Sequence, residues 1–178
     1  MKQQALELDR NNYIQIARRF DASTERVFDA WLDPKIASRW LFTSPASLES
    51  DFDLDVRVGG KWRISDRCDD TEYAAIGEYL AIDRPHRLVF TFAMPQFSLE
   101  YDRVIVDIAP DGDGCILTLT EEGLPPSYEG PSKNGWSSMF NDLAAALNWV
   151  APTQGHRPMC SSTVAVNFGN SCPNIGCS

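Results

Sequence analysis

Six polar side chains stand among apolar residues in the central part of this 178-residue sequence, where they could orient a bound molecule. Arginine and glutamate pair with charged groups, and tyrosine hydroxyls donate or accept hydrogen bonds. Recognition of a small molecule is the chemistry that such scattered groups support. For each charged residue the alternative is an ion pair at the surface, which is the commoner role. The six residues are Arg63, Glu78, Tyr79, Tyr101, Arg103 and Glu121.

The sequence offers little for covalent or acid–base catalysis. A serine or cysteine nucleophile needs a neighbouring base, and the histidines are His86, in the expected turn DRPHRL, and His156, near the C-terminus. The acidic residues at 51–55 and at 121–122 resemble solvated strand faces rather than a catalytic carboxyl pair. The sequence leaves open a cyclase activity that works through the shape of the cavity and one tyrosine or glutamate as the acid. Whether the protein is an enzyme is therefore undecided, with the balance against it.

No cofactor and no metal are expected. Neither GxGxxG nor GxxxxGK[ST] occurs, so nucleotide binding has no support. Zinc sites need histidines and cysteines in tight local groups, whereas the five cysteines form no CxxC pair. An odd count without a visible secretory signal favours free thiols over a disulfide framework. The cysteines are Cys68, Cys115, Cys160, Cys172 and Cys177.

Aromatic side chains are numerous and recur on the expected strands and on the last expected helix. In most domains such residues pack in the core, and this is the alternative for each of them singly. Taken together, a cavity lined by apolar residues with few polar groups is the default site for a small molecule. We therefore predict that a small hydrophobic or aromatic ligand contacts Trp40, Trp62, Tyr79, Phe90, Phe92, Tyr101, Trp136, Met139, Phe140 and Leu143.

One long amphipathic helix is expected to form a wall of this cavity. Apolar residues recur every three or four positions over residues 135–150, GWSSMFNDLAAALNWV, which is the period of one helix face. Pro131 stands where it can start a helix, and residues 152–155 end it. The apolar face consists of Trp136, Met139, Phe140, Leu143, Leu147 and Val150.

The residues before this helix predict strands, turns and two short helices. Helices are expected at 24–32 and 35–40, separated by Asp33-Pro34. Gly59-Gly60 predicts a two-residue type I′ hairpin turn, in which both residues have positive φ, and residues 111–114, DGDG, predict another turn. The expected strands are 13–20, 48–58, a return strand through Trp62 and Ile64, 73–82, 87–92, 99–108 and 115–122.

Five local patterns carry a resemblance to known proteins. In chain order they are RRFDASTERVFDAWLDPKIASRW (18–40), VGGKWRI (58–64), GEYLAIDRPHRLVFTF (77–92), DGDGCILTLTEEGLP (111–125) and GWSSMFNDLAAALN (135–148). Together they resemble the START-like or SRPBCC superfamily, and more narrowly its branch related to the activator of heat-shock-protein-90 ATPase. The resemblance covers residues 13–150. It implies an α+β helix-grip fold, in which a curved antiparallel sheet wraps around a long C-terminal helix and two short helices follow the first strand.

The resemblance leaves three functions open, because members of this superfamily carry lipids, sense hormones, cyclise polyketides or assist chaperones. The first hypothesis is non-enzymatic binding of a small hydrophobic or aromatic ligand between the sheet and the C-terminal helix. The second is a cyclase-, aromatase- or hydrolase-like enzyme that uses the same cavity. The third is a co-chaperone-like protein-binding module, which the family name alone implies, together with a role in the stress response.

Composition narrows the class of partner and the compartment. A net charge of −9 and a pI of about 4.6 argue against nucleic acid and against an anionic membrane. No apolar run approaches the roughly 18 residues of a membrane span, and no secretory signal is visible, so a cytoplasmic protein is expected. We expect a lead-in at 1–12, one domain at 13–150 and an irregular, flexible tail at 151–178. A homodimer is left open.

Overall fold

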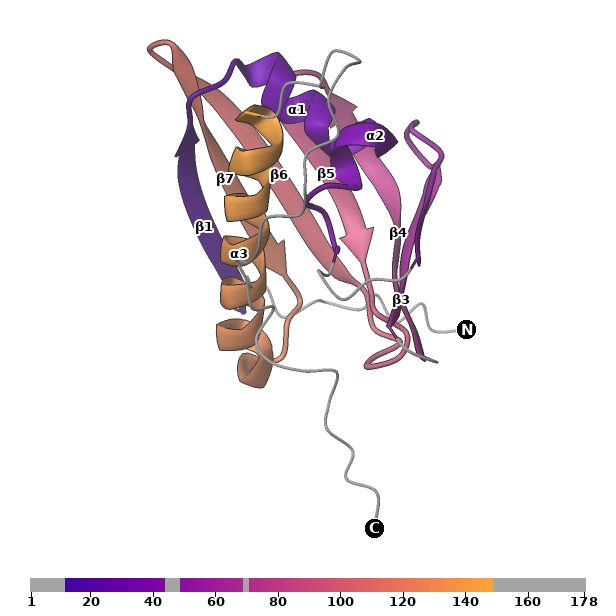
Figure 1. Ribbon diagram of the computed structural model, residues 1–178. Coiled ribbons are helices and arrows are strands. Elements are labelled where there is room, and N and C mark those ends of the chain that lie inside the picture. Colours follow the sequence, from indigo (N-terminus) through magenta and orange to yellow (C-terminus); the bar gives the residue numbers. More distant parts are fainter. Residues whose placement is uncertain (1–11, 44–48, 69–70, 149–178) are drawn as a thin grey trace, which may run out of the picture.

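Seven strands form one antiparallel sheet with the order β1-β7-β6-β5-β4-β3-β2 (Figure 1). The structure is a computed structural model that describes residues 12–43, 49–68 and 71–148. The elements are β1 (Tyr13–Phe20), α1 (Thr24–Leu32), α2 (Pro34–Ala37), β2 (Glu49–Leu54), β3 (Lys61–Cys68), β4 (Thr71–Asp83), β5 (Arg87–Phe92), β6 (Asp102–Asp111), β7 (Gly114–Glu122), the 3₁₀ helix η1 (Pro126–Tyr128) and α3 (Glu129–Asn148).

All three α-helices lie on one face of the sheet, which we call the inner face (Figure 1). Helix α3 packs on β1, and α1 packs on β6. Successive side chains of a strand point to opposite faces, and Val104, Val106 and Ile108 of β6 are buried in alternation. This arrangement is the predicted α+β helix-grip fold, which is thereby confirmed.

The long helix begins six residues earlier than its apolar pattern predicts. It starts at Glu129 instead of Gly135, and it passes through Pro131 in its first turn, where a missing N–H costs no helical hydrogen bond. The added residues are polar and carry no apolar stripe, so periodicity could not detect them. The predicted apolar face is confirmed within the described residues, where Trp136, Met139, Phe140, Leu143 and Leu147 are buried.

The hairpin between β2 and β3 forms where it was predicted but has a different turn. Strand β2 ends at Leu54, and the valines of the connection, Val56 and Val58, are exposed. Gly59 has a φ of 80°, whereas Gly60 has no positive φ, so the predicted type I′ turn is wrong. Gly60 is needed for another reason, because a Cβ there would lie 2.0 Å from the carbonyl oxygen of Asp55.

Strand β6 and helix α2 are shorter than predicted. Strand β6 begins at Asp102 instead of Leu99, and Leu99 is 82% exposed. Helix α2 ends at Ala37, three residues before Trp40. The indole of Trp40 is buried, and its Nε1 donates to the carbonyl oxygen of Ala30 at 3.0 Å.

The predicted segments at the chain ends lie outside the described residues. This holds for the expected tail at 151–178, with His156 and the cysteines Cys160, Cys172 and Cys177, and for the lead-in up to residue 11. Among the described residues, Cys115 is a buried free thiol. None of the described helices is both long enough and apolar enough to cross a membrane. In the same part of the chain no group of three or more histidine, cysteine, aspartate or glutamate residues could hold a metal ion.

Candidate functional site

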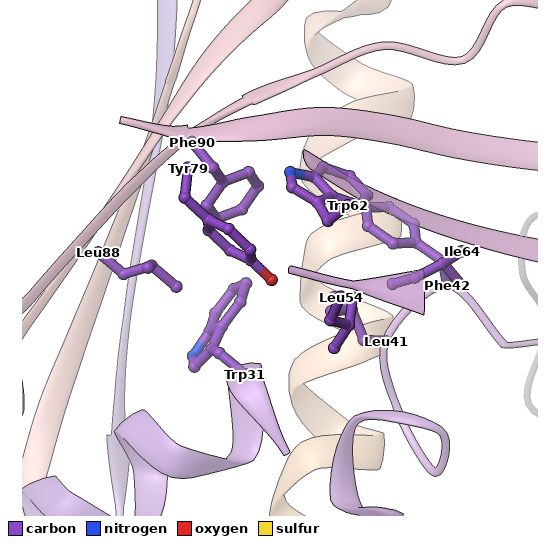
Figure 2. Close-up of a pocket in the computed structure, with 9 residues that line it drawn as sticks. All are labelled: Trp31, Leu41, Phe42, Leu54, Trp62, Ile64, Tyr79, Leu88 and Phe90. Carbon is purple, nitrogen blue, oxygen red and sulfur yellow. The ribbon is translucent and has the colours of Figure 1, made fainter. Parts of the chain in front are cut away.

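An apolar pocket lies between α1, the residues that follow α2, and strands β2 to β5 (Figure 2). The volume open to water is about 10 Å³, which is room for about one water molecule. In this state the aromatic rings themselves fill most of the space between helices and sheet. The pocket is lined by Trp31, Leu41, Phe42, Leu54, Trp62, Ile64, Tyr79, Leu88 and Phe90.

Strand alternation brings most of these side chains to the pocket. Trp62 and Ile64 are two residues apart on β3, as are Leu88 and Phe90 on β5, so each pair shares the inner face. Tyr79 of β4 is the register partner of Phe90. From sequence alone, the period of these strands predicts which residues face inward, but not which of them border a void.

The pocket contains few polar atoms. The Tyr79 side chain is buried, which raises the pKa of its hydroxyl and keeps it protonated at neutral pH. Figure 2 shows this hydroxyl directed toward the centre of the pocket. The Nε1 groups of Trp31 and Trp62 are buried without a hydrogen-bond partner among the described residues. An unpaired buried N–H costs about 1–3 kcal/mol.

Phe42 joins the pocket to α3. Its ring lies parallel to the rings of Phe92 (centroids 5.1 Å apart) and Trp62 (6.2 Å), and edge-on to Trp136 (5.6 Å). Its amide N–H donates to the sulfur of Met139 at 3.4 Å. The backbone of Phe42 has a φ of 51°, a left-handed conformation that costs a bulky residue about 1–3 kcal/mol. The Phe42 ring is therefore held in place by its aromatic neighbours against backbone strain.

Three of the ten residues predicted as ligand contacts line the pocket, namely Trp62, Tyr79 and Phe90. Another three surround Phe42 without lining the pocket, and they are Phe92, Trp136 and Met139. Three more are buried in the core away from the pocket lining, and they are Trp40, Phe140 and Leu143. Tyr101, which precedes β6, is 51% exposed.

Sequence reasoning missed six of the lining residues. Trp31 and Phe42 were not among the predicted ligand contacts, and the aliphatic residues carry no chemical signal that separates a pocket wall from a core. For Phe42 the available signal was its place directly after the bulky pair Trp40-Leu41. The six are Trp31, Leu41, Phe42, Leu54, Ile64 and Leu88.

Two of the predicted polar candidates lie in ion pairs instead of the pocket. Arg63 pairs with Glu72, and Arg103 pairs with Glu122, with each arginine side chain more than two-fifths exposed. Glu78, next to Tyr79 on β4, points to the face opposite to that residue. The surface interpretation therefore applies to both arginines.

Glu121 is different, because its side chain is fully buried. It shares the inner face of β7 with Leu117 and Leu119, so the interpretation of residue 121 as part of a solvated strand face is wrong. Its Oε2 accepts hydrogen bonds from the Ser132 hydroxyl and from Nε1 of Trp136 (2.9 Å), both on α3. Its Oε1 has no partner among the described residues. Burial raises the pKa of Glu121, and the two donors oppose this only in part.

A second carboxyl group, that of Asp102, lies near Glu121. Asp102 is two residues before Val104 on β6 and therefore faces the same inner side of the sheet. Burial, and then the negative charges of Glu121 and Glu100, raise the pKa of Asp102 to about 7. Asp102 is also the register partner of Phe92 on β5. The two carboxyl groups thus border the aromatic residues around Phe42. Sequence reasoning did not select Asp102, although its parity with Val104 was readable.

Replacing Glu121 by glutamine is expected to change how stability depends on pH. Because the folded-state pKa of Glu121 lies above the ordinary 4.5, its stabilising contribution is complete below that pH and is lost as the pH rises through the folded-state pKa. The raised pKa of Asp102 makes the stability of the protein fall with rising pH in the same way. Glutamine does not titrate, so the variant does not lose stability at residue 121 as the pH rises. In urea unfolding from about pH 4 to about pH 8, the variant should gain stability relative to the unmodified protein as the pH rises.

The matched control is Glu122→Gln, which removes the neighbouring carboxyl group from the opposite face of β7, where it pairs with Arg103. This control should show no comparable gain with pH. A constant difference between Glu121→Gln and the unmodified protein over the whole range would contradict the assignment of Glu121 as an unpaired buried acid.

Solved structures from several bacteria share this architecture. A protein from Chromobacterium violaceum, CV1439, is 26% identical, with a TM-score of 0.69 over 78% of this chain and 99% of that one. Mll3558 from Rhizobium loti is 25% identical, with a TM-score of 0.64 over 76% and 96%. SA2116 from Staphylococcus aureus, a protein of unknown function, is 20% identical, with a TM-score of 0.67 over 76% and 93%, which shows the fold alone.

No curated protein matches the chain. A family model does match, and it covers residues 21–148, which include both short helices, strands β2 to β7 and the whole described length of α3. The matched region contains the pocket, Phe42 with its aromatic neighbours, and the carboxyl groups of Asp102 and Glu121. The chain therefore belongs to the family of activator of Hsp90 ATPase homolog 1-like proteins.

Proposed function

We propose that this protein binds a small hydrophobic or aromatic molecule between the sheet and the helices, without transforming it. The observation that carries the proposal is the pocket of nine residues, whose only polar atoms on side chains are one tyrosine hydroxyl and two indole nitrogens. Such a lining gains free energy by burying apolar surface and fixes orientation with few hydrogen bonds. Helix-grip domains of this family are typically ligand-binding, which supports the same function.

Binding requires the pocket to enlarge, since a space of about 10 Å³ holds no organic molecule. The Phe42 ring is the side chain best suited to move out of the pocket when a ligand enters. Its backbone strain is released if the residue leaves the left-handed region. A planar ligand in its place would take over the parallel contacts with Phe92 and Trp62. The small pocket of this structure is, in this proposal, the ligand-free state.

The proposal predicts saturable binding of N-phenyl-1-naphthylamine, a neutral aromatic probe whose fluorescence rises in apolar surroundings. Phe42→Ala should bind it about fivefold or more tightly, because the substitution removes the ring that competes with the probe for the space beside Phe92 and Trp62. The control is Tyr128→Ala on η1, where the side chain is 53% exposed; its affinity should equal that of the unmodified protein. Absence of saturable binding in both the unmodified protein and Phe42→Ala would contradict the proposal.

One observation favours an enzymatic alternative. With a pKa of about 7, Asp102 can both accept and donate a proton at neutral pH, as a cyclase- or hydrolase-like enzyme would need. Asp102 does not line the pocket, which is why non-enzymatic binding is the first proposal. Asp102→Asn separates the two functions, since it should abolish turnover of any substrate by an enzyme of this kind while leaving binding of the neutral probe intact.

A further inference from the structure

The carboxyl groups of Glu121 and Asp102 face the inner side of the sheet without a cation. Neither takes part in an ion pair among the described residues, and Oε1 of Glu121 is buried with no hydrogen-bond partner there. Buried carboxylates are normally paired with a cation or hydrogen-bonded on both oxygens, because desolvation of an unpaired charge is costly. The structure therefore leaves a buried carboxyl oxygen without a partner among the described residues, which a ligand can satisfy.

Aromatic rings border these carboxyl groups. Asp102 lies opposite Phe92 in the β5–β6 register, and the indole that donates to Glu121 is that of Trp136. The Trp136 ring lies 6.3 Å from that of Phe92 and 5.6 Å from that of Phe42, between centroids. The negative faces of aromatic rings attract alkylammonium groups, and carboxylates at the same place add to that attraction.

From this juxtaposition we infer that the ligand is an aromatic or apolar compound with a basic amine, whose ammonium group binds Oε1 of Glu121 and the carboxylate of Asp102. The inference rests on the proposed function: the apolar part of the compound takes the place of the Phe42 ring, and the ammonium group extends toward β6 and β7. The ammonium group donates hydrogen bonds to both carboxylates and supplies the missing positive charge.

Further observations favour an amine over a carbonyl compound. A carbonyl oxygen would accept from one protonated carboxyl group and leave the other without compensation, whereas an ammonium group serves both. Glu100 adds a third negative charge near Asp102. The nearby arginine, Arg103, pairs with Glu122 on the opposite face of the sheet. The net charge of −9 also attracts cationic ligands from solution.

A matched pair of probes tests the inference, namely 2-(1-naphthyl)ethylamine and 2-(1-naphthyl)ethanol, titrated calorimetrically into the full chain at about pH 7.5. The amine is expected to bind about tenfold or more tightly than the alcohol, as charge-assisted hydrogen bonds predict. Glu121→Gln should remove most of this preference, and Asp102→Asn, which alters a less buried side chain, should reduce it by about threefold. Glu122→Gln should leave it unchanged.

The outcomes separate this inference from the proposed function. Equal binding of the two probes, or tighter binding of the alcohol, would overturn the amine inference and leave the apolar site standing. The same holds if neither binds while N-phenyl-1-naphthylamine does. Failure of all three probes would overturn both proposals. If Glu121→Gln does not fold, Asp102→Asn still decides, because an unchanged amine preference in that variant would contradict the inference.

Discussion

Replacing Trp136 by alanine is expected to lower the free energy of unfolding by about 3–5 kcal/mol, as for other large aromatic residues removed from a core. The side chain is 2% exposed. Its ring lies between 5.6 and 6.5 Å, centroid to centroid, from four others. Alanine would leave a cavity between α3 and the sheet that these rings cannot fill without moving. The four rings are those of Trp31, Phe42, Phe92 and Phe140.

The loss should divide into a packing part and a hydrogen-bonding part. Trp136→Phe retains most of the buried ring but removes the Nε1 donor to Glu121, so about 1–3 kcal/mol is expected from this variant. Tyr128→Ala, at an exposed aromatic residue of η1, should stay within about 0.5 kcal/mol of the unmodified protein. Urea unfolding followed by circular dichroism measures all three. A loss below about 1 kcal/mol for Trp136→Ala would contradict the packing described here.

Gly77→Ala is expected to destabilise the protein by about 3 kcal/mol or more, or to prevent folding. A Cβ at this position of β4 would lie 1.8 Å from the carbonyl oxygen of Thr91 and 2.6 Å from Nε1 of Trp62. The indole could rotate, but the carbonyl belongs to the backbone of β5. Relief would require β4 and β5 to separate where the Glu78 amide donates to the Thr91 hydroxyl at 2.9 Å.

Gly135→Ala provides the matched control. This glycine lies within α3, and an added Cβ there meets nothing within 4 Å. Alanine in an open helical position is expected to stabilise the protein by about 0.5–1 kcal/mol. The two substitutions add the same methyl group and should shift the thermal midpoint in opposite directions. If Gly77→Ala were as stable as the unmodified protein, the close approach of β4 and β5 would be wrong.

The fold was predictable because its signals are local. Alternation along the strands, the three-four spacing over Trp136 to Leu147, and the turn glycines each depend on a few neighbouring residues. The element boundaries that were predicted wrongly lie where the local apolar pattern differs from the packing in the structure. Val56 and Val58 continue the alternation of β2 beyond its end, and the polar first turns of α3 carry no apolar period.

The carboxyl site escaped prediction because of that same boundary. The apolar pattern begins at Gly135, so nothing in it indicated that Ser132 lies over Glu121. The first turns of α3, which the apolar pattern did not predict, supply the Ser132 hydroxyl and cover the carboxyl group. Acidic residues are rarely buried, so a solvated strand face was the natural interpretation of residue 121. The alternation that places Glu121 on the same face as Leu119 could be read from the sequence. The turns of α3 that cover its side chain could not.

The pocket was only partly predictable for a different reason. The concentration of aromatic side chains on the expected strands was the available signal, and it identified Trp62, Tyr79 and Phe90. Which inward residues border a void depends on the left-handed backbone of Phe42 and on the positions of α1 and α3 on the sheet. These are consequences of tertiary packing, for which one sequence carries no periodic signal.

The pairing of the first strand with the last has a consequence for the order of folding. Ile14 of β1 lies opposite Glu121 of β7, so this edge of the sheet joins segments roughly 100 residues apart in the chain. Contacts of such high sequence separation form late and slow the folding of a domain. During synthesis β1 has no partner until β7 has emerged, and the buried side chain of Ile14 stays exposed to water until then. Strand β1 is therefore synthesised before the other strands but can join the sheet only after β7 has been made, and α3 then packs on it.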